Sequence, residues 1–363
     1  MKTIAIVGTN GVPAAYGGFE TLADNLVQYL EGRFRFVVYC SKTPKAKRLP
    51  EYHGARLIYV PLRANGWQSL IYDCLTTLHA FFTADVILLL GPGFGFVLPL
   101  NAIFRRRLIV NYGGLDEWER EKLSRLQKSY TYASTDIAAR SASVNVADNE
   151  QLRRSLRRAF GAEAAVIRYG GDHAQRPVAI DPALRAKYPF LSRPYFVSMS
   201  RAQVDNNLHL VIDAFKRTPG QRLVLISNWT ASDYGRQLFA DNQGLPNITL
   251  LPAIYDQAEL NAVRSRGRAY VHSHSRCGTA PSLVEAISLG LPIISFDVAT
   301  NRETTADKAL YFGSADELAA TVASIDDQSL ARVAHDLAPL AAKAYRWRHI
   351  ADQYARLFEP AAA

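Results

Sequence analysis

Short hydrophobic runs alternate with amphipathic segments along the whole chain. In the first half the hydrophobic runs lie near residues 3–8, 34–40, 56–60, 85–90, 107–111, 143–147 and 164–168. In the second half they lie near residues 195–199, 222–226, 248–251, 269–271, 292–295 and 309–312. Most of the intervals between them show helical periodicity, and strands that alternate with helices are typical of parallel sheets. The pattern predicts an α/β protein with two doubly wound, Rossmann-like domains.

The periodicity also suggests where the domains begin and end. We expect an N-terminal domain at 1–170 and a C-terminal domain at 195–345. Residues 171–194 have weak periodicity, and residues 170–194 contain four prolines, so 171–194 are predicted to form a linker. The amphipathic segment at 346–363 is predicted to form a helix that crosses back to the N-terminal domain.

Composition narrows the class of protein. The 363 residues are 48% hydrophobic, enough to bury two cores. The three cysteines, Cys40, Cys74 and Cys277, are widely spaced and indicate neither a disulfide framework nor a thiolate metal site. The chain enters a strand directly after Met1 without a signal peptide, which favours the cytoplasm. Residues 86–104 carry no charge, but their glycines and prolines favour strand, loop and short helix over a membrane span.

The positive charge lies in the first half of the chain. Residues 1–170 hold 22 Lys and Arg against 14 Asp and Glu, whereas residues 171–363 hold 20 against 19. A basic domain suits an anionic membrane or a lipid-phosphate acceptor, so we expect peripheral contact with the inner face of the cell membrane. A solvated basic surface is the alternative. No recognition motif accompanies the charge, so nucleic acid is not predicted as a partner.

The segment 272–295 contains the most informative local pattern. It reads as the end of a strand, a polar turn, a helix carrying Glu285, and a further strand. A helix N-terminus offers unpaired N–H groups to an anion, and the Glu285 carboxylate beside it could hold a sugar diol. The alternative is a capping box, Ser282-x-x-Glu285, that serves helix stability alone.

Two further loops follow the first strand of each domain. The first contains Gly17 and Gly18 and matches neither Gly-x-Gly-x-x-Gly nor a P-loop. The two glycines allow close approach of a phosphate or sugar, or merely permit a tight turn. The second loop contains Arg201, whose guanidinium would neutralise a departing diphosphate, with a surface salt bridge as the alternative. Asp205 and Asn206 in the same loop could also be helix caps.

Several longer phrases resemble a known family. They are Gly17-Gly-Phe-Glu-Thr21, Tyr112-Gly-Gly-Leu-Asp-Glu-Trp118, Ile167-Arg-Tyr-Gly-Gly-Asp172, Asp205-Asn-Asn207 and the segment from His272 to Glu285. Over almost the whole chain the sequence resembles retaining nucleotide-sugar glycosyltransferases of family 4, and most closely the rhamnosyltransferase branch that builds capsular and related surface polysaccharides. The resemblance implies the GT-B fold, in which two Rossmann-like domains face a cleft.

The resemblance also implies roles for residues. Arg201 and Asn206 would hold the donor diphosphate, although the family usually has lysine in place of Asn206, and Glu285 would bind the ribose. The family commonly has two glutamates eight positions apart. Glu285 matches the second of them, and Cys277 stands in the place of the first. Gly113 stands where the branch often has an aspartate. The acceptor or catalytic contact of that aspartate is therefore expected to move to Asp116 or Glu117.

The local sequence patterns and the family resemblance together predict a set of site residues. The expected catalytic residues are Arg201, Asn206 and Glu285. The expected donor-binding residues are Gly17, Gly18, Arg201, Asn206, Pro252, Ala253, Ile254, His274, Cys277, Gly278, Thr279, Ala280, Pro281, Ser282 and Glu285. The expected acceptor-binding residues are Tyr16, Phe19, Glu20, Tyr112, Asp116 and Glu117. No metal is predicted, because the chain lacks Asp-x-Asp and the pair His272 and His274 has no nearby carboxylate.

The predicted reaction is transfer of a sugar, with retention, from a nucleoside-diphosphate donor to a lipid-linked or oligosaccharide acceptor. By resemblance the sugar is L-rhamnose and the pathway is bacterial surface polysaccharide synthesis. No cofactor is expected beyond the dTDP- or UDP-sugar co-substrate. Two alternatives remain open: a nucleotide-sugar epimerase of the same architecture, and a non-catalytic carbohydrate-binding assembly subunit.

Overall fold

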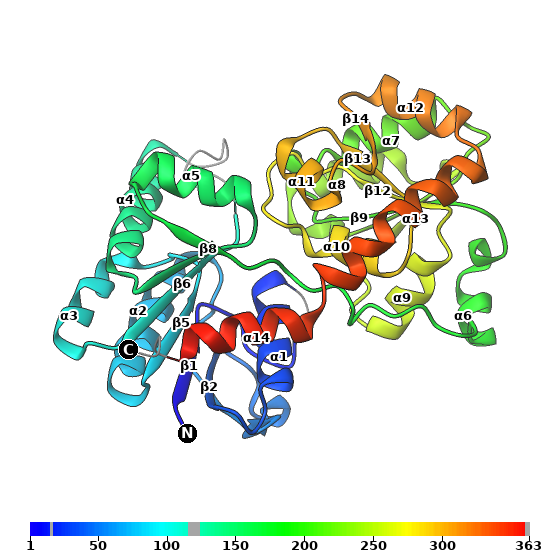
Figure 1. Cartoon of the computed structure of the whole chain (residues 1–363). Coiled ribbons are helices and arrows are strands. Elements are labelled where there is room, and N and C mark those ends of the chain that lie inside the picture. Colours follow the sequence, from blue (N-terminus) through cyan, green and yellow to red (C-terminus); the bar gives the residue numbers. More distant parts are fainter. Residues whose placement is uncertain (15–16, 115–123, 360–363) are drawn as a thin grey trace. The chain divides into compact units, whose positions relative to one another are not determined.

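The chain forms two compact units, each built on one sheet (Figure 1). The computed structural model describes residues 1–14, 17–114 and 124–359. Unit 1 consists of Met1–Tyr169 together with Trp347–Ala363, and unit 2 consists of Gly170–Arg346. The units are described separately below.

Unit 1 contains an eight-stranded sheet with the order β3-β4-β2-β1-β5-β6-β7-β8. All its pairings are parallel except that between β3 and β4. The strands are β1 (Thr3–Val7), β2 (Arg35–Cys40), β3 (Glu51–Tyr52), β4 (Ala55–Tyr59), β5 (Val86–Leu90), β6 (Arg107–Tyr112), β7 (Val144–Ala147) and β8 (Ala164–Val166). The short β3, which pairs with β4 through a tight turn, was not predicted from the hydrophobic pattern.

Helices cover both faces of this sheet. They are α1 (Gly18–Tyr29), α2 (Ser69–Thr83), α3 (Asn101–Phe104), α4 (Arg125–Ser141), α5 (Glu150–Phe160) and α14 (Trp347–Phe358), with 3-10 turns η1 (Lys45–Lys47), η2 (Gly66–Gln68) and η3 (Gly95–Leu100). Alternate residues of β1 enter different cores: Ile4 and Ile6 pack with α1 and α14, whereas Ala5 and Val7 pack with α2 and α4. This alternation explains why the strands read as continuous hydrophobic runs.

Unit 2 contains a six-stranded parallel sheet with the order β11-β10-β9-β12-β13-β14. Its strands are β9 (Phe196–Met199), β10 (Leu223–Ser227), β11 (Ile248–Pro252), β12 (Ala269–His272), β13 (Ile293–Phe296) and β14 (Leu310–Phe312). Its helices are α6 (Pro182–Lys187), α7 (Leu208–Lys216), α8 (Asp233–Asn242), α9 (Gln257–Ser265), α10 (Pro281–Ser288), α11 (Ala299–Thr305), α12 (Ala315–Ser324) and α13 (Asp327–Lys343), with 3-10 turns η5 (Pro189–Ser192), η6 (Val204–Asn206) and η7 (Trp229–Ala231). Two cores again lie on the two faces of the sheet.

The segment 171–194, predicted as a linker, belongs to unit 2. It contains α6 and η5, and its Tyr188 and Ala174 are buried in one core of that unit. The prediction of a linker was wrong because prolines that start a helix and a 3-10 turn were interpreted as signs of a connection.

The uncharged segment 86–104 divides into β5, a loop, η3 and α3. Among the described residues, no helix has the length and apolar character that a membrane crossing requires.

Candidate functional site

The loops after β9 and β12 lie at the point of the unit 2 sheet where the strand order reverses. From β9 the sheet continues through β10 and β11 on one side and through β12, β13 and β14 on the other. In open parallel sheets, ligands bind outside the carboxyl ends of the strands at this switch point. The two loops carry Arg201 and His274, so the topology brings together two residues that are widely separated in sequence.

Hydrogen bonds join these two loops. Ser273 Oγ donates to the carbonyl of Asn206 at 2.6 Å, and Asn207 Nδ2 donates to the carbonyl of Ser273 at 3.1 Å. The backbone N–H and the hydroxyl of Ser275 both donate to the carbonyl of Asp205, at 3.0 and 2.8 Å. Four bonds between the loops fix their backbones relative to one another, as a preorganised site requires.

Arg201 is exposed at the edge of this joined pair of loops. Burial and, after it, the positive charge of Arg201 lower the pKa of His274 to about 4, against the opposing effect of Asp205. The guanidinium therefore lies close enough to His274 for their charges to interact, which places a free cation beside the turn that was predicted to bind a diphosphate.

Asn206 is buried beside Arg201. Its side chain is 7% exposed, and its Nδ2 donates to the backbone carbonyl of Arg201 at 2.8 Å. In the described conformation the amide thus holds the Arg201 loop in shape. Diphosphate binding by Asn206 stays a prediction.

The turn from Cys277 to Pro281 leads into α10 without a side-chain cap. The capping box does not form, because Ala280 is the N-cap residue and Ser282 lies inside the helix. An uncapped helix N-terminus retains unpaired N–H groups and a partial positive charge. The end of α10 is thus suited to an anion, as predicted for the run Gly278, Thr279, Ala280, Pro281 and Ser282.

Glu285 of α10 forms a buried ion pair that was not predicted. Its Oε2 accepts a hydrogen bond from the guanidinium of Arg264, which comes from α9 and is completely buried. Its Oε1 lies 3.2 Å from Nε2 of His173. Burial alone would raise the pKa of Glu285, but Arg264 and His173 outweigh burial and lower it to about 2. Glu285 is therefore a fixed, ionised carboxylate whose remaining lone pairs can accept hydrogen bonds from hydroxyl groups.

His173 reaches Glu285 because Gly171 packs tightly against α10. A Cβ on Gly171 would collide with the Ser288 hydroxyl and the Val284 carbonyl. His173 was not among the predicted site residues. The sequence Tyr169-Gly-Gly-Asp172 before His173 contains a signal for this packing, since paired glycines allow another backbone to approach closely.

The loop after β11 carries the predicted base-recognition residues. Pro252 ends β11 and is exposed, Ala253 is half-buried, and Ile254 packs against a unit 2 core. The loop leaves the carboxyl end of its strand, as do those carrying Arg201 and His274, but β10 separates β11 from β9. A role for this loop in nucleotide binding stays a prediction.

In unit 1 the loop after β1 also lies at a switch point, between β1 and β5. Gly17 is the N-cap residue of α1 with φ of 119°, and a Cβ there would collide with the Glu20 carboxylate. Glu20 is buried, and its Oε1 accepts hydrogen bonds from the backbone and side-chain amides of Asn10 at 2.9 and 2.7 Å. In the described conformation Glu20 fixes the loop, which differs from the predicted acceptor contact. Donor binding by Gly17 and Gly18 stays a prediction.

Phe19 and Tyr112 are also placed differently from a sugar-stacking pair. Tyr112 is 3% exposed, and its hydroxyl donates to Asn145 Oδ1 at 3.0 Å, so it packs in a core of unit 1 in the described conformation. Acceptor binding by Tyr112 and Phe19 stays a prediction. Phe19 covers Gly113, where an added Cβ would lie 2.8 Å from its ring. The aspartate that the resembling branch often has at this position would require Phe19 to move. Tyr16, Asp116 and Glu117 lie outside the described residues.

Asp73 of α2 is a candidate residue that the sequence did not reveal. It is 8% exposed, and none of the described residues pairs with its carboxylate. A Cβ on Gly93, in the loop after β5, would collide with its Oδ2, so Asp73 lies beside the switch point of unit 1. Burial raises the pKa of Asp73 to about 7. At neutral pH the Asp73 carboxyl group is therefore partly protonated and partly ionised.

Replacing Asp73 with asparagine is expected to stabilise unit 1 at alkaline pH. The folded state binds a proton more tightly than the unfolded chain, so the wild-type carboxyl contributes stability below pH 4 that disappears as the pH rises through about 7. The rise from 3.8 to about 7 corresponds to about 4 kcal/mol at most. Unfolding midpoints of D73N and wild type should therefore differ more at pH 8.5 than at pH 5. A difference independent of pH, or an equal effect of E51Q at the exposed Glu51, would contradict the assignment.

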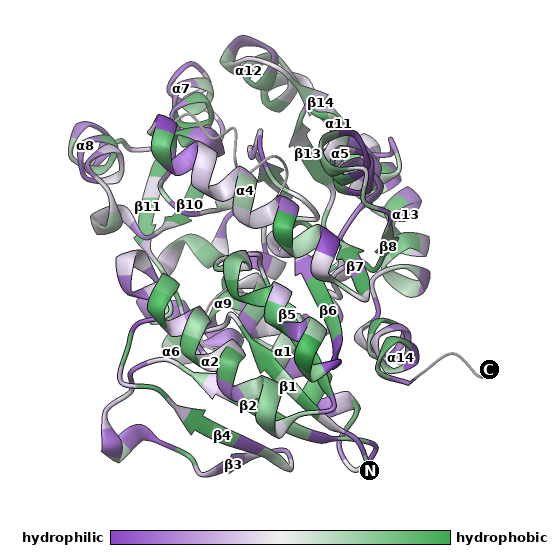
Figure 2. Ribbon diagram, turned by 90° about the vertical axis from the view of Figure 1, so that its left-hand side faces the viewer, coloured by the Kyte–Doolittle hydropathy of each residue, from purple (hydrophilic) through white to green (hydrophobic). Residues whose placement is uncertain are grey.

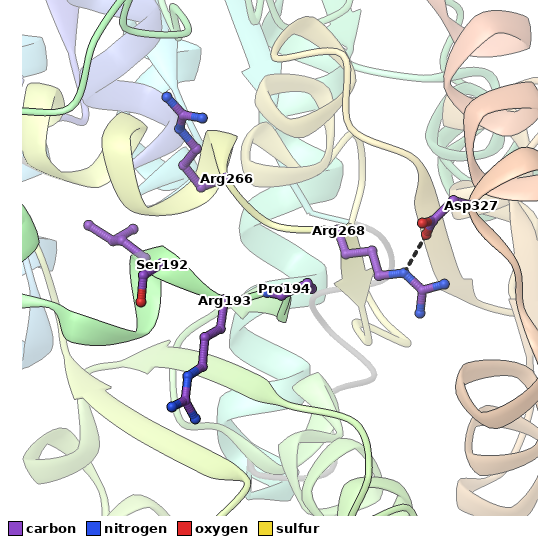
Figure 3. A pocket seen from close by; sticks show the side chains of 7 residues that line it. Ser192, Arg193, Pro194, Arg266, Arg268 and Asp327 are labelled. Carbon is purple, nitrogen blue, oxygen red and sulfur yellow. Dashed lines mark hydrogen bonds and ion pairs between the residues drawn. The ribbon is translucent and has the colours of Figure 1, made fainter.

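A separate shallow pocket lies at the opposite edge of the unit 2 sheet (Figure 3). Its volume is about 380 Å³, and it is lined by Leu191, Ser192, Arg193, Pro194, Arg266, Arg268 and Asp327. Pro194 and Arg268 precede the amino ends of β9 and β12, and Arg268 pairs with Asp327 at 2.8 Å. None of the predicted site residues lines this pocket.

Each part of the chain is similar to a different family of proteins. Residues 181–338 match the family model described as glycosyl transferases group 1, and residues 1–172 match a domain of unknown function, DUF1972. No curated protein sequence matches the chain.

Solved structures match over the whole length. Sucrose-phosphate synthase from Thermosynechococcus elongatus has a TM-score of 0.82 at 18% identity, covering 99% of this chain and 98% of its own. HepE of Anabaena in complex with UDP and glucose has a TM-score of 0.73 at 17% identity, covering 98% and 99%. The trehalose-6-phosphate synthase OtsA has a TM-score of 0.77 at 11% identity, covering 99% of both chains. The chain therefore has the predicted GT-B fold, and its first and second parts are similar to DUF1972 and to group 1 glycosyl transferases, respectively.

Proposed function

We propose that the protein transfers a sugar from a nucleoside-diphosphate donor to an acceptor hydroxyl, with retention at the anomeric carbon. The observation that carries the proposal is the joined pair of loops at the unit 2 switch point, in which the charge of Arg201 acts on His274, in the turn that leads to the uncapped end of α10. Charge on the departing diphosphate is the main obstacle in such a reaction, and preorganised donors aimed at that charge supply much of the acceleration.

The proposed donor site assigns a separate role to each group. Arg201 and the N-terminus of α10 would bind the diphosphate, and the ionised Glu285 would accept hydrogen bonds from ribose hydroxyls. Arg264 and His173 would act as positioning residues, since they hold Glu285 in one orientation. The proposed transfer uses no metal clamp on the diphosphate.

The identity of the donor is proposed from likeness. HepE is described in complex with UDP and with UDP-glucose, and an OtsA structure is described with UDP-2-fluoro glucose. A UDP- or dTDP-linked sugar is therefore the donor class we propose. L-rhamnose as the sugar and surface polysaccharide synthesis as the pathway rest on the sequence resemblance.

We also propose that unit 1 contacts the cell membrane, where a lipid-linked acceptor would be found. Its α2 exposes Ile71, Leu75 and Phe82 at helical spacing, in line with the hydrophobic colouring of this helix in Figure 2. The neighbouring η3 and α3 expose Phe96, Leu100 and Ile103, and Phe82 contacts Phe104 of α3 at 4.7 Å between ring centres. These six exposed residues are called the apolar patch of unit 1.

Basic residues adjoin the apolar patch. Arg105 follows α3 and is exposed, and Arg106 donates to the carbonyl of Phe81 in α2 at 2.9 Å. Exposed apolar side chains beside arginines fit the interface of an anionic bilayer, where the apolar groups enter the acyl boundary and the arginines contact phosphate.

Replacing Leu75 and Ile103 together with serine is expected to weaken binding to phosphatidylglycerol vesicles by at least about tenfold, because two apolar side chains no longer leave water. Co-sedimentation measures the binding. Vesicles of phosphatidylcholine alone should bind the wild type more weakly, and added salt should reduce the difference. V178S, at a fully exposed residue of unit 2, is the matched control. Equal binding by the double variant and V178S would reject this surface.

Product analysis tests the proposed reaction. A panel of UDP- and dTDP-sugars is screened by thermal shift, because a ligand that binds the folded state raises its apparent stability. The best donor is then incubated with lipid-linked acceptors, and the anomeric configuration of the product is determined by NMR. We expect the configuration of the donor to be retained, whereas an inverted product would reject the retaining mechanism.

A further inference from the structure

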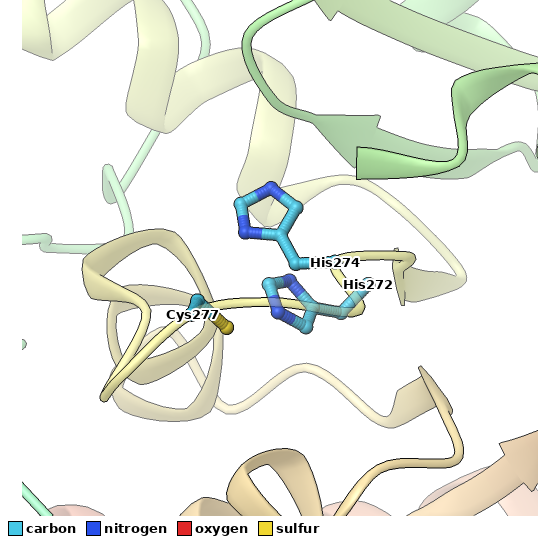
Figure 4. Close-up of side chains that lie close together, drawn as sticks. All are labelled: His272, His274 and Cys277. Atoms are coloured by element: carbon cyan, nitrogen blue, oxygen red, sulfur yellow. The ribbon is translucent and has the colours of Figure 1, made fainter. Parts of the chain in front are cut away.

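His272, His274 and Cys277 form a cluster on the turn after β12 (Figure 4). One potential ligand atom from each residue lies within 4.8 Å of those of the other two. The rings of His272 and His274 have their centres 4.4 Å apart. Figure 4 shows the sulfur of Cys277 directed toward the His272 ring. No metal was predicted from the two histidines, because no carboxylate lies near them in the sequence, and Cys277 was not predicted as a metal ligand.

His272 is buried and His274 is half-buried, and three buried ring nitrogens of this pair make no hydrogen bond within the described residues. This holds for both ring nitrogens of His272, which is 1% exposed, and for Nε2 of His274. Buried polar groups are normally paired, and an unpaired one calls for a specific cause such as an ion. Asn301, the nearby amide, commits its Nδ2 to the carbonyls of His274 and Phe296, each at 2.9 Å. Its Oδ1 lies 3.7 Å from the Cys277 sulfur.

Electrostatics favour neutral imidazoles in the cluster. Burial lowers the pKa of His272 well below its usual value, and His274 lowers it further, against the side chain of Asn301. A neutral imidazole keeps the lone pair that a metal needs, whereas a protonated one does not.

We propose that His272, His274 and Cys277 bind one borderline-soft divalent transition metal ion of the Zn²⁺ type. Two imidazoles and a thiolate are ligands that Zn²⁺ prefers, and three protein ligands leave a fourth position for water. In a tetrahedral site the ligand atoms stand about 3.5 Å apart, so small side-chain rotations close the observed spacing. On binding, the thiol of Cys277 loses its proton to solvent, a metal–sulfur bond forms, and no oxidation occurs.

The metal site overlaps the proposed donor site, and this part of the inference rests on the proposed function. His274 and Cys277 belong to the turn that leads to the N-terminus of α10, and Arg201 interacts with His274. A bound metal would fix this turn around the ion and occupy space required by the diphosphate. Zn²⁺ would therefore oppose donor binding instead of assisting the reaction.

Cobalt substitution in the full chain tests the metal site without any substrate. Co²⁺ bound to a thiolate gives a charge-transfer band in the near ultraviolet, and we expect this band in the wild type at one ion per chain. Addition of Zn²⁺ should displace Co²⁺ and abolish the band. Zn²⁺ binding to the metal-free chain should release about one proton per ion in weakly buffered solution. The variant C277S should lose the band, and its Zn²⁺ affinity should fall by at least about tenfold.

Matched variants separate a specific site from binding elsewhere. C74S removes a half-buried thiol of unit 1 and should behave as wild type. H274Q should also weaken the affinity for Zn²⁺, and circular dichroism checks that each variant is folded. Absence of the thiolate band in the wild type, or an equal band in C277S, would overturn the proposal.

Calorimetric titration with UDP tests the overlap with the donor site, with free Zn²⁺ set by a chelating buffer. UDP should bind the wild type more weakly when Zn²⁺ is bound and should bind C277S equally with and without Zn²⁺. Equal UDP affinity in the wild type with and without bound Zn²⁺ would overturn the overlap. Failure of UDP to bind at all would instead count against the proposed function and leave the cobalt result unaffected.

Discussion

Replacing Arg201 with alanine is expected to lower the rate of sugar transfer by about 10²- to 10³-fold, the usual consequence of removing one preorganised donor to developing charge. The side chain is exposed, so the fold should be retained. R201K should restore only part of the rate, because lysine supplies the charge without the bidentate geometry of the guanidinium. The rate is measured as acceptor-dependent release of nucleoside diphosphate at saturating donor.

A second readout for this variant does not depend on transfer. The Arg201 charge contributes to the lowered pKa of His274, so the pKa should rise in R201A from about 4 while burial still keeps it below its ordinary value. An NMR titration of the imidazole measures the change. R222A, at an exposed arginine just before β10, is the matched control. It should alter neither the transfer rate nor the pKa of His274. A normal transfer rate in R201A would remove Arg201 from the mechanism.

Replacing Arg264 with methionine is expected to destabilise unit 2 by about 3 to 5 kcal/mol, because the Glu285 carboxylate would remain buried without its principal partner. The double variant R264M/E285Q should recover most of this loss, since no buried charge is left uncompensated. Amide hydrogen exchange, followed in peptides from α9 and α10, separates this effect from the stability of unit 1.

The loss in R264M should depend on pH. The pKa of Glu285 is lowered from 4.5 to about 2, so the stability from its ionised form is present above pH 4.5 and disappears as the pH falls toward 2. The difference between R264M and wild type should therefore narrow on acidification. The control R266M changes a neighbouring exposed arginine and should have little effect. An R264M protein as stable as R266M at pH 7 would contradict the assigned ion pair.

The sheets and the position of the donor loops could be predicted from sequence because both follow from local patterns. Hydrophobic runs mark the buried strands, and the residue after each parallel strand lies at the same edge of the sheet. Arg201 and His274 each follow such a strand, and the family resemblance assigned both to one donor site. Their hydrogen-bonded loops explain that proximity in atomic terms.

The residues that were missed depend on tertiary packing. Arg264 lies on an amphipathic helix where arginine normally indicates solvent, and only the fold places Glu285 beside it. Asp73 has no local signature, since its perturbed pKa arises from burial next to Gly93. The burial of Tyr112 could not be predicted either, because an aromatic residue at a strand end suits a core and a sugar platform equally.

The central claim is most directly tested by incubating the chain with a panel of UDP- and dTDP-sugars, with and without lipid-linked acceptor, and measuring released nucleoside diphosphate. We predict that at least one donor gives release that requires acceptor and falls by about 10²-fold or more in R201A. Interconversion of the nucleotide-sugar without acceptor, or equal release by wild type and R201A, would contradict glycosyl transfer at this site.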